Sequence, residues 1–279
     1  MSEKQEKMRQ CAEKLLRDGE AGYVIGWGET RFDDRTTPIF VEDPAGAGAF
    51  VWNEYAINSL AKYLLDDKYP DKKIGLFTRG CESRAINRLL KDNQIKRENV
   101  YLIGVPCDGK KSDRCTLCRE RNPILYDVLL WTPEDDPPPA AGRFDRVKDI
   151  EAMSPDERYV YWGETYDSCI RCYACRNVCP ACNCRECYAD MSKTGFQGKQ
   201  HSRSDNQIFG VTRAFHVGDR CIECGECERV CPMNLPIMGQ TQKILKDINE
   251  LTGEYECGMD ATSENYLGRF DLDDKDEFM

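Results

Sequence analysis

Hydrophobic and polar positions in the first part of the chain predict a helix, two short strands and a second helix. Apolar residues recur at helical spacing over residues 3–18, and Gly19 ends this pattern. Short β-type runs follow at residues 23–27 and 38–41. Over residues 50–65, aromatic and aliphatic side chains again recur at helical spacing. We therefore expect residues 50–65 to form a helix.

A strand–helix–strand pattern comes next. Residues 73–78 and 100–105 are nearly continuous apolar runs, and residues 82–92 between them have helical periodicity. Such a unit is a βαβ crossover, which makes its two strands parallel. Continuous apolar strands indicate a sheet that is covered on both faces. Residues 1–131 are therefore predicted to form a small α/β domain.

Prolines and acidic residues interrupt this pattern, and helical patterns resume after them. The proline- and acid-rich stretch predicts a linker over residues 132–153. The sequence Ser-Pro-Asp-Glu at residues 154–157 is typical of a helix start, and a helix is expected over residues 156–166. Further helices are expected over residues 204–216 and 235–251. The pattern over residues 204–216 predicts one buried face, formed by Ile208, Val211, Thr212 and Phe215.

The predicted fold class is α+β overall, with an N-terminal α/β domain that contains a βαβ unit and a C-terminal α-helical domain. The helical domain is predicted over residues 154–256. Residues 257–279 are rich in acidic side chains and are expected to form a tail that is mobile or ordered only against a partner.

A cysteine motif occurs twice in the helical half. The two copies are Cys169-x2-Cys172-x2-Cys175-x3-Cys179-Pro180 and Cys221-x2-Cys224-x2-Cys227-x3-Cys231-Pro232. This spacing is typical of ferredoxins with two 4Fe–4S clusters, in which the fourth cysteine of each motif ligates the other cluster. It predicts one cluster on Cys169, Cys172, Cys175 and Cys231, and a second on Cys221, Cys224, Cys227 and Cys179. Zinc is the alternative, because paired Cys-x2-Cys units also build zinc ribbons. Three cysteines in tandem followed by Cys-Pro favour iron–sulfur clusters within an α-helical ferredoxin domain.

Four more cysteines converge on the predicted sheet. Cys81 and Cys107 each come just after a strand of the βαβ unit, so both are expected at the carboxyl edge of the sheet. The pair Cys115-x2-Cys118 follows in a loop that is long enough to fold over this edge. These four thiols predict a third 4Fe–4S cluster; a structural zinc site and unpaired structural thiols are the alternatives.

A third group of cysteines follows the first motif directly. Cys182-x-Cys184-x2-Cys187 predicts a further cluster that lacks one cysteine ligand. The fourth ligand is expected from Cys257, from a partner chain or from a residue other than cysteine. The alternative is a cysteine-rich shell that screens the adjacent cluster.

Composition narrows the class of protein. The net charge of −10 disfavours nucleic acid as a partner, and no run of 18 apolar residues predicts a membrane span. The charged start has no apolar segment typical of a signal peptide. Seventeen cysteines, many in cluster spacing, indicate a reducing cytoplasmic location and a source with little oxygen. The two histidines, His201 and His216, belong to no ligand motif, and no catalytic residue is assigned.

Two stretches resemble a known family. Thr-Arg-Gly-Cys-Glu-Ser-Arg-Ala-Ile at residues 78–86 and Tyr-Leu-Ile-Gly-Val-Pro-Cys-Asp-Gly at residues 101–109 resemble the β-subunit family of deazaflavin-coenzyme-reducing hydrogenases and formate dehydrogenases. The C-terminal half is similar to the helical dicluster subunits of heterodisulfide-reductase-type complexes.

The resemblance implies an iron–sulfur electron-transfer subunit of an anaerobic multi-subunit oxidoreductase. Such a subunit would relay single electrons between a catalytic subunit of hydrogenase or formate dehydrogenase type and a flavin- or heterodisulfide-reductase-type partner. The alternative is an enzyme that binds FAD near Arg79 and Arg84 and itself reduces a deazaflavin or nicotinamide coenzyme. The more ordinary interpretation of these arginines is a solvated loop and helix face. A third hypothesis is a redox sensor or cluster scaffold.

Overall fold

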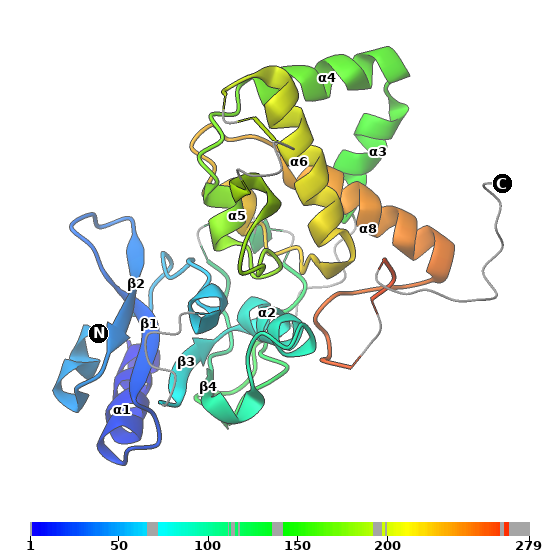
Figure 1. The fold of residues 1–279 in the computed structure, drawn as a ribbon. Coiled ribbons are helices and arrows are strands. Elements are labelled where there is room, and N and C mark those ends of the chain that lie inside the picture. Colours follow the sequence, from blue (N-terminus) through cyan, green and yellow to red (C-terminus); the bar gives the residue numbers. More distant parts are fainter. Residues whose placement is uncertain are drawn as a thin grey trace.

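A twisted sheet forms the first part of the molecule and a group of helices forms the second (Figure 1). The computed structural model describes residues 2–65, 72–110, 112, 115–116, 118–135, 142–191, 197–198, 200–262 and 265–267. The sheet has five strands in the order β2-β1-β3-β4-β5. Its strands are β1 (Tyr23–Glu29), β2 (Thr36–Val41), β3 (Ile74–Thr78), β4 (Val100–Gly104) and β5 (Val128–Leu129).

The predicted βαβ unit is confirmed. Strands β3 and β4 pair in parallel, with Ile74 opposite Val100, and α2 (Gly80–Lys91) connects them. Strand β1 also pairs in parallel with β3, whereas β2 is an antiparallel edge strand. All of β3 is buried, as its continuous apolar sequence predicts. The carboxyl ends of β3 and β4 therefore meet at one edge of the sheet.

The helices predicted over residues 3–18, 156–166, 204–216 and 235–251 begin and end close to where the sequence predicts. Helix α1 (Glu3–Arg17) starts at the Ser2 side chain, which accepts a hydrogen bond from the backbone N–H of Gln5. Ser154 and Glu157 form the predicted capping box of α4. The helices of the second part are α3 (Asp145–Ala152), α4 (Pro155–Asp167), α5 (Ala174–Val178), α6 (Arg203–Val217), α7 (Glu226–Arg229) and α8 (Met238–Thr252). In the part of the chain that the structure describes, no helix is both long and apolar enough to cross a bilayer.

The predicted helix over residues 50–65 is wrong. The segment runs as irregular chain up to a short 3-10 helix, η2 (Ala61–Leu65). The guanidinium of Arg79 explains the difference, because it donates hydrogen bonds to three consecutive carbonyls, those of Ala56, Ile57 and Asn58. In an α-helix these carbonyls would accept from backbone N–H groups instead. A tertiary contact therefore overrides the local periodicity.

Two expectations about the second part also need correction. The predicted linker contains a helix, α3, which packs against α8. On α6 the predicted face is turned outward, since Ile208, Val211 and Phe215 are exposed. The buried side chains of α6 are instead Asn206, Phe209, Arg213, Ala214 and Val217.

The start of the predicted acidic tail is part of the folded structure. Cys257 is buried, and its carbonyl accepts hydrogen bonds from Arg84 of α2. Asn87 of the same helix donates to the carbonyl of Gly258. The aromatic ring of Tyr266 packs edge-on against Tyr255. Residues 268–279 of this predicted tail lie outside the described residues.

Helix α2 lies between the sheet and the helical part of the molecule (Figure 1). The apolar core of the sheet continues into side chains from the helical part, namely Ile222, Leu245, Ile248, Tyr255 and Cys257. The backbone N–H of Ser59 also donates to the buried carboxylate of Glu226. The boundary predicted between the two domains is therefore crossed by a shared core.

Candidate iron–sulfur sites

The four cysteines that are predicted to bind the first cluster line one common cavity. Cys169, Cys172, Cys175 and Cys231 all line one volume of about 40 Å³. Arg171 and Tyr173 have left-handed backbone conformations, which curl the chain around this volume. The backbone N–H of Arg171 points to the Sγ atom of Cys169 at 3.4 Å. The fourth cysteine comes from the second motif, as the crossed ligand assignment requires.

The second cavity repeats this arrangement. Cys179, Cys221, Cys224 and Cys227 line a volume of about 20 Å³. Glu223 and Gly225 have the left-handed conformations that Arg171 and Tyr173 have in the first loop. The backbone N–H of Glu223 points to the Sγ atom of Cys221 at 3.4 Å. The two motifs thus fold as copies of one loop and exchange their fourth cysteines.

A third cavity lies at the carboxyl edge of the sheet. Cys81, Cys107, Cys115 and Cys118 line a volume of about 90 Å³. Cys81 lies in the first turn of α2, and Cys107 follows β4. The backbone N–H of Cys107 donates to the carbonyl of Arg121 at 2.9 Å, which fixes the returning loop beside the sheet edge. Topology therefore gathers the four cysteines in the way that the sequence predicts, and their role as ligands stays a prediction.

The three cavities form a row. The sheet-edge cavity and the Cys221 cavity share the lining residues Ile222, Cys224, Gly225 and Met238. The Cys221 cavity and the Cys169 cavity share Arg213. In the described part of the chain, no three His, Cys, Asp or Glu side chains are placed to bind a single metal ion. The cysteines surround hollow volumes instead.

Comparison with known proteins agrees with this geometry. Residues 165–235 match the family model of the 4Fe-4S dicluster domain. This segment is therefore similar to dicluster domains, and we refer to it as the dicluster domain. The F420-dependent formate dehydrogenase subunit beta of Methanocaldococcus jannaschii is 23% identical, over 72% of this chain and 76% of the relative. The F420-dependent formate dehydrogenase 1 subunit beta of Methanococcus maripaludis is 38% identical over 109 residues, which are 38% of this chain and 27% of the relative. The resemblance to β subunits of this type is confirmed.

Burial sets the protonation of many of the thiols. Desolvation raises the pKa of Cys107, Cys118, Cys169 and Cys175, so these side chains are neutral thiols without metal. A hydrogen bond from the Cys182 thiol instead lowers the pKa of Cys179. Iron is bound by thiolates, so loading the sites releases protons and places negative charge in a buried region.

The buried guanidinium of Arg213 can balance that negative charge. Arg213 of α6 is 6% exposed and lines both cavities of the dicluster domain. Its Nη2 donates to the carbonyl of Cys175 at 3.2 Å, whereas its Nε has no hydrogen-bond partner. In the described residues no carboxylate pairs with it. A buried cation of this kind needs a nearby anion, and the thiolates of an iron–sulfur cluster provide it. The cysteine sets and Arg213 together fit bound clusters.

Arg79 and Arg84 are not the solvated side chains that the ordinary interpretation expects. Arg79 is fully buried and forms an ion pair with Glu82 at 2.7 Å. It also donates to the three carbonyls of residues 56–58 named above. The opposite charge of Glu82 keeps its pKa high against the cost of burial. Arg84 holds the carbonyl of Cys257. Both guanidinium groups thus donate to acceptors within the protein, and both residues also line the sheet-edge cavity.

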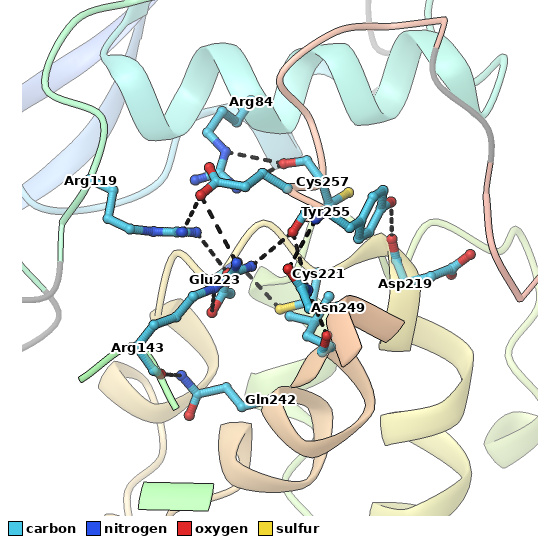
Figure 2. A network of polar contacts seen from close by, with 12 residues as sticks. Arg84, Arg119, Arg143, Asp219, Cys221, Glu223, Gln242, Asn249, Tyr255 and Cys257 are labelled. Carbon is cyan, nitrogen blue, oxygen red and sulfur yellow. Dashed lines mark hydrogen bonds and ion pairs between the residues drawn. The ribbon is translucent and has the colours of Figure 1, made fainter. Parts of the chain in front are cut away.

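A network of ion pairs joins the sheet-edge cavity to the dicluster domain. Figure 2 shows Arg119 and Arg143 converging on Glu223, at 3.0 and 2.6 Å. Arg119 also pairs with Glu256. Sequence reasoning missed these residues and Arg213. Arg119 follows Cys118 and Glu223 lies between Cys221 and Cys224, so their positions beside ligands are a usable signal. Arg143 falls in the predicted linker and carries no such signal.

Gly80 allows a test of the sheet-edge site. A Cβ atom at this position would lie 2.2 Å from the carbonyl oxygen of Glu120, in the backbone that follows Cys118. Gly80→Ala should push this loop away from Cys81, and iron per chain should fall by about four, the content of one cube. Iron analysis of anaerobically purified protein measures this. Gly48→Ala is the matched control, because nothing lies within 4 Å of its added Cβ. Equal iron content in the two variants would contradict the prediction.

Proposed function

We propose that this chain is the electron-transfer subunit of an anaerobic, formate dehydrogenase-like oxidoreductase complex. It would relay single electrons between a catalytic subunit, of hydrogenase or formate dehydrogenase type, and a flavin- or heterodisulfide-reductase-type partner. The observation that carries the proposal is the row of three cavities, each lined by one of the predicted sets of four cysteines and each sharing residues with the next. The names of the relatives, which are β subunits of F420-dependent formate dehydrogenases, support the kind of complex.

The proposed ligand sets follow the three cavities. Bound 4Fe–4S clusters would supply one-electron redox chemistry. The residues of the chain would hold the iron through thiolates, exclude water by burial and adjust the potentials through nearby charge. Arg213 would adjust the potentials of the two clusters in the dicluster domain. The Arg119–Glu223 pair would hold the loops of the sheet-edge site and the Cys221 site together. The ligand sets are, in the order of the row, Cys81, Cys107, Cys115 and Cys118; Cys179, Cys221, Cys224 and Cys227; and Cys169, Cys172, Cys175 and Cys231.

The row has two different ends. The sheet-edge cavity lies beside the α/β part, and the Cys169 cavity lies at the other side of the dicluster domain. An electron relay needs a partner at each end, so two contact surfaces are expected. We place these partners in the cytoplasm, where thiols stay reduced. The chemical reaction itself would take place in the partner subunits.

Metal content and electron transfer test the proposal together. Anaerobically purified chain should contain at least about twelve irons with matching acid-labile sulfide, at four irons per cube. Cys107→Ser should remove about four of them. Cys11→Ser is the control, because Cys11 lines none of the three cavities of the row.

The transfer itself is measured on the complex isolated through this chain. Formate or hydrogen should reduce the acceptor of the native complex. With Cys107→Ser, this transfer should be lost while the catalytic partner still reduces an artificial dye. A complex that transfers electrons equally well without the sheet-edge cluster would contradict the proposed row. Stoichiometric flavin on the purified chain would instead favour the enzyme that reduces a deazaflavin or nicotinamide coenzyme.

A further inference from the structure

A fourth cavity lies beside the row and is larger than the other three. Its volume is about 370 Å³, and it is formed by the segment that follows the first motif together with α6. Cys182, Cys184 and Cys187 all line it. The cysteine-rich segment therefore faces a common space of its own, and not only the cavity of the neighbouring site.

The lining of this cavity is strongly cationic. Among the described residues that line it, Asp190 is the single carboxylate, and this side chain pairs with Arg176 at 2.7 Å. The thiol of Cys187 contacts Arg176 as well. Lys62 reaches across from the α/β part and donates to the carbonyl of Cys182. The cationic side chains that line the cavity are Lys62, Arg176, Arg185, Arg213 and Arg220, and of these Arg220 pairs with Asp92. So many cations around three cysteines favour an anionic occupant, and a cluster on three thiolates is one.

The structure narrows the search for a fourth ligand. Cys257 does not line this cavity and instead packs on α2, with Arg84 at its carbonyl. Expecting Cys257 as a ligand here is therefore wrong. The ring of His216 packs edge-on against Tyr188, with ring centroids 5.2 Å apart. Asp190 is already engaged by Arg176. Three thiols are thus available for the four corners of a cube.

We propose that Cys182, Cys184 and Cys187 bind a further 4Fe–4S cluster whose fourth iron has no cysteine ligand and faces the cationic cavity. This cluster would branch from the row, because the cavity shares Ala181, Arg213, Val217 and Arg220 with the Cys221 cavity. The inference builds on the proposed function, since it adds a site to the same set of clusters. The open iron would make this site a position for an exchangeable anionic ligand, whereas the clusters in the row are closed by four cysteines.

An iron without a cysteine ligand is the one that oxidation removes first. Ferricyanide takes one electron from the cube, which then releases one iron: [4Fe–4S]²⁺ gives [3Fe–4S]⁺, Fe²⁺ and one electron. The electron reduces ferricyanide to ferrocyanide. Added Fe²⁺ and dithionite reverse the step. Cubes that have four cysteine ligands are expected to lose iron only with a larger excess of ferricyanide, because a thiolate holds each iron.

The test is a ferricyanide titration of the anaerobically purified full chain. About sixteen irons per chain are expected before oxidation. One equivalent of ferricyanide should produce one 3Fe–4S centre per chain, detected by its isotropic electron paramagnetic resonance signal, and release one Fe²⁺. The double variant Cys184→Ser/Cys187→Ser should contain about four irons fewer and give no such signal. These two positions are chosen because Cys182 contacts Cys179 of the neighbouring site.

Two controls make the result decisive. Cys11→Ser should behave as the unmodified chain, and Cys107→Ser should lose four irons but keep the full 3Fe–4S signal. A chain with about twelve irons that gives no 3Fe–4S centre would overturn the proposal and leave the electron-transfer function standing. A 3Fe–4S signal that persists in the double variant would overturn it as well, because the open cluster would then lie in the row.

Discussion

Replacing Arg213 by leucine is expected to lower the reduction potentials of both clusters of the dicluster domain while leaving the sheet-edge cluster unchanged. Arg213 is buried and lines both cavities of that domain, but it does not line the sheet-edge cavity. A cation favours the reduced, more negative form of a cluster, so its loss makes reduction harder. At an effective dielectric constant of about 20, unit charges about 8 Å apart interact by roughly 2 kcal/mol, equivalent to on the order of 90 mV for one electron.

An anaerobic redox titration followed by electron paramagnetic resonance measures these potentials one cluster at a time. Arg213→Lys keeps the charge and should retain most of the potential of the unmodified protein. The proposed sheet-edge cluster would provide a reference within the same molecule. If leucine shifted all the clusters equally, the effect would be a general loosening of the structure rather than the loss of a local charge. If nothing shifted, Arg213 would not set the potentials.

The sequence predicts the cysteine sites better than it predicts the packing around them. Ligand spacing is a local constraint, so the repeated motif predicts two crossed sets, and Cys169 and Cys231 do line one cavity. The third set also follows from simple topology, since parallel strands bring Cys81 and Cys107 to one edge. In both cases a few backbone rules connect the residue pattern to the place.

The predictions that are wrong concern segments where the structure buries polar side chains that make hydrogen bonds near the cysteine sites. Apolar patterning selects the wrong face of α6, because the structure buries Asn206 and Arg213 there. Asn206 donates to the carbonyls of Tyr166 and Cys169, which orders the start of the first cysteine loop. Arg79 similarly draws three carbonyls into the core and prevents the helix predicted over residues 50–65. Hydrophobic periodicity contains no information about such contacts.

Glu223→Gln is expected to destabilise the protein strongly while leaving every cysteine in place. Glu223 is 10% exposed and pairs with Arg119 and Arg143, each 14% exposed. Neutralising it leaves two nearly buried guanidinium groups without their shared carboxylate. Breaking a buried pair costs roughly 3–5 kcal/mol, and the lower end applies here because Arg119 keeps its contact with Glu256. The thermal midpoint should fall by roughly 6–12 °C.

The same substitution should also weaken two sites together. Glu223 lies between Cys221 and Cys224, and its partner Arg119 follows Cys118, so their ion pair connects the loops of the second and third cavities. A chelator should therefore remove iron faster from these two clusters than from the cluster at Cys169. Anaerobic melting followed by circular dichroism, and iron release to the chelator, measure the two effects. Glu13→Gln is the matched control, since it breaks an exposed pair with Arg17 and should cost less than about 1 kcal/mol. If Glu223→Gln melted like this control, the network in Figure 2 would not hold the two cavities together.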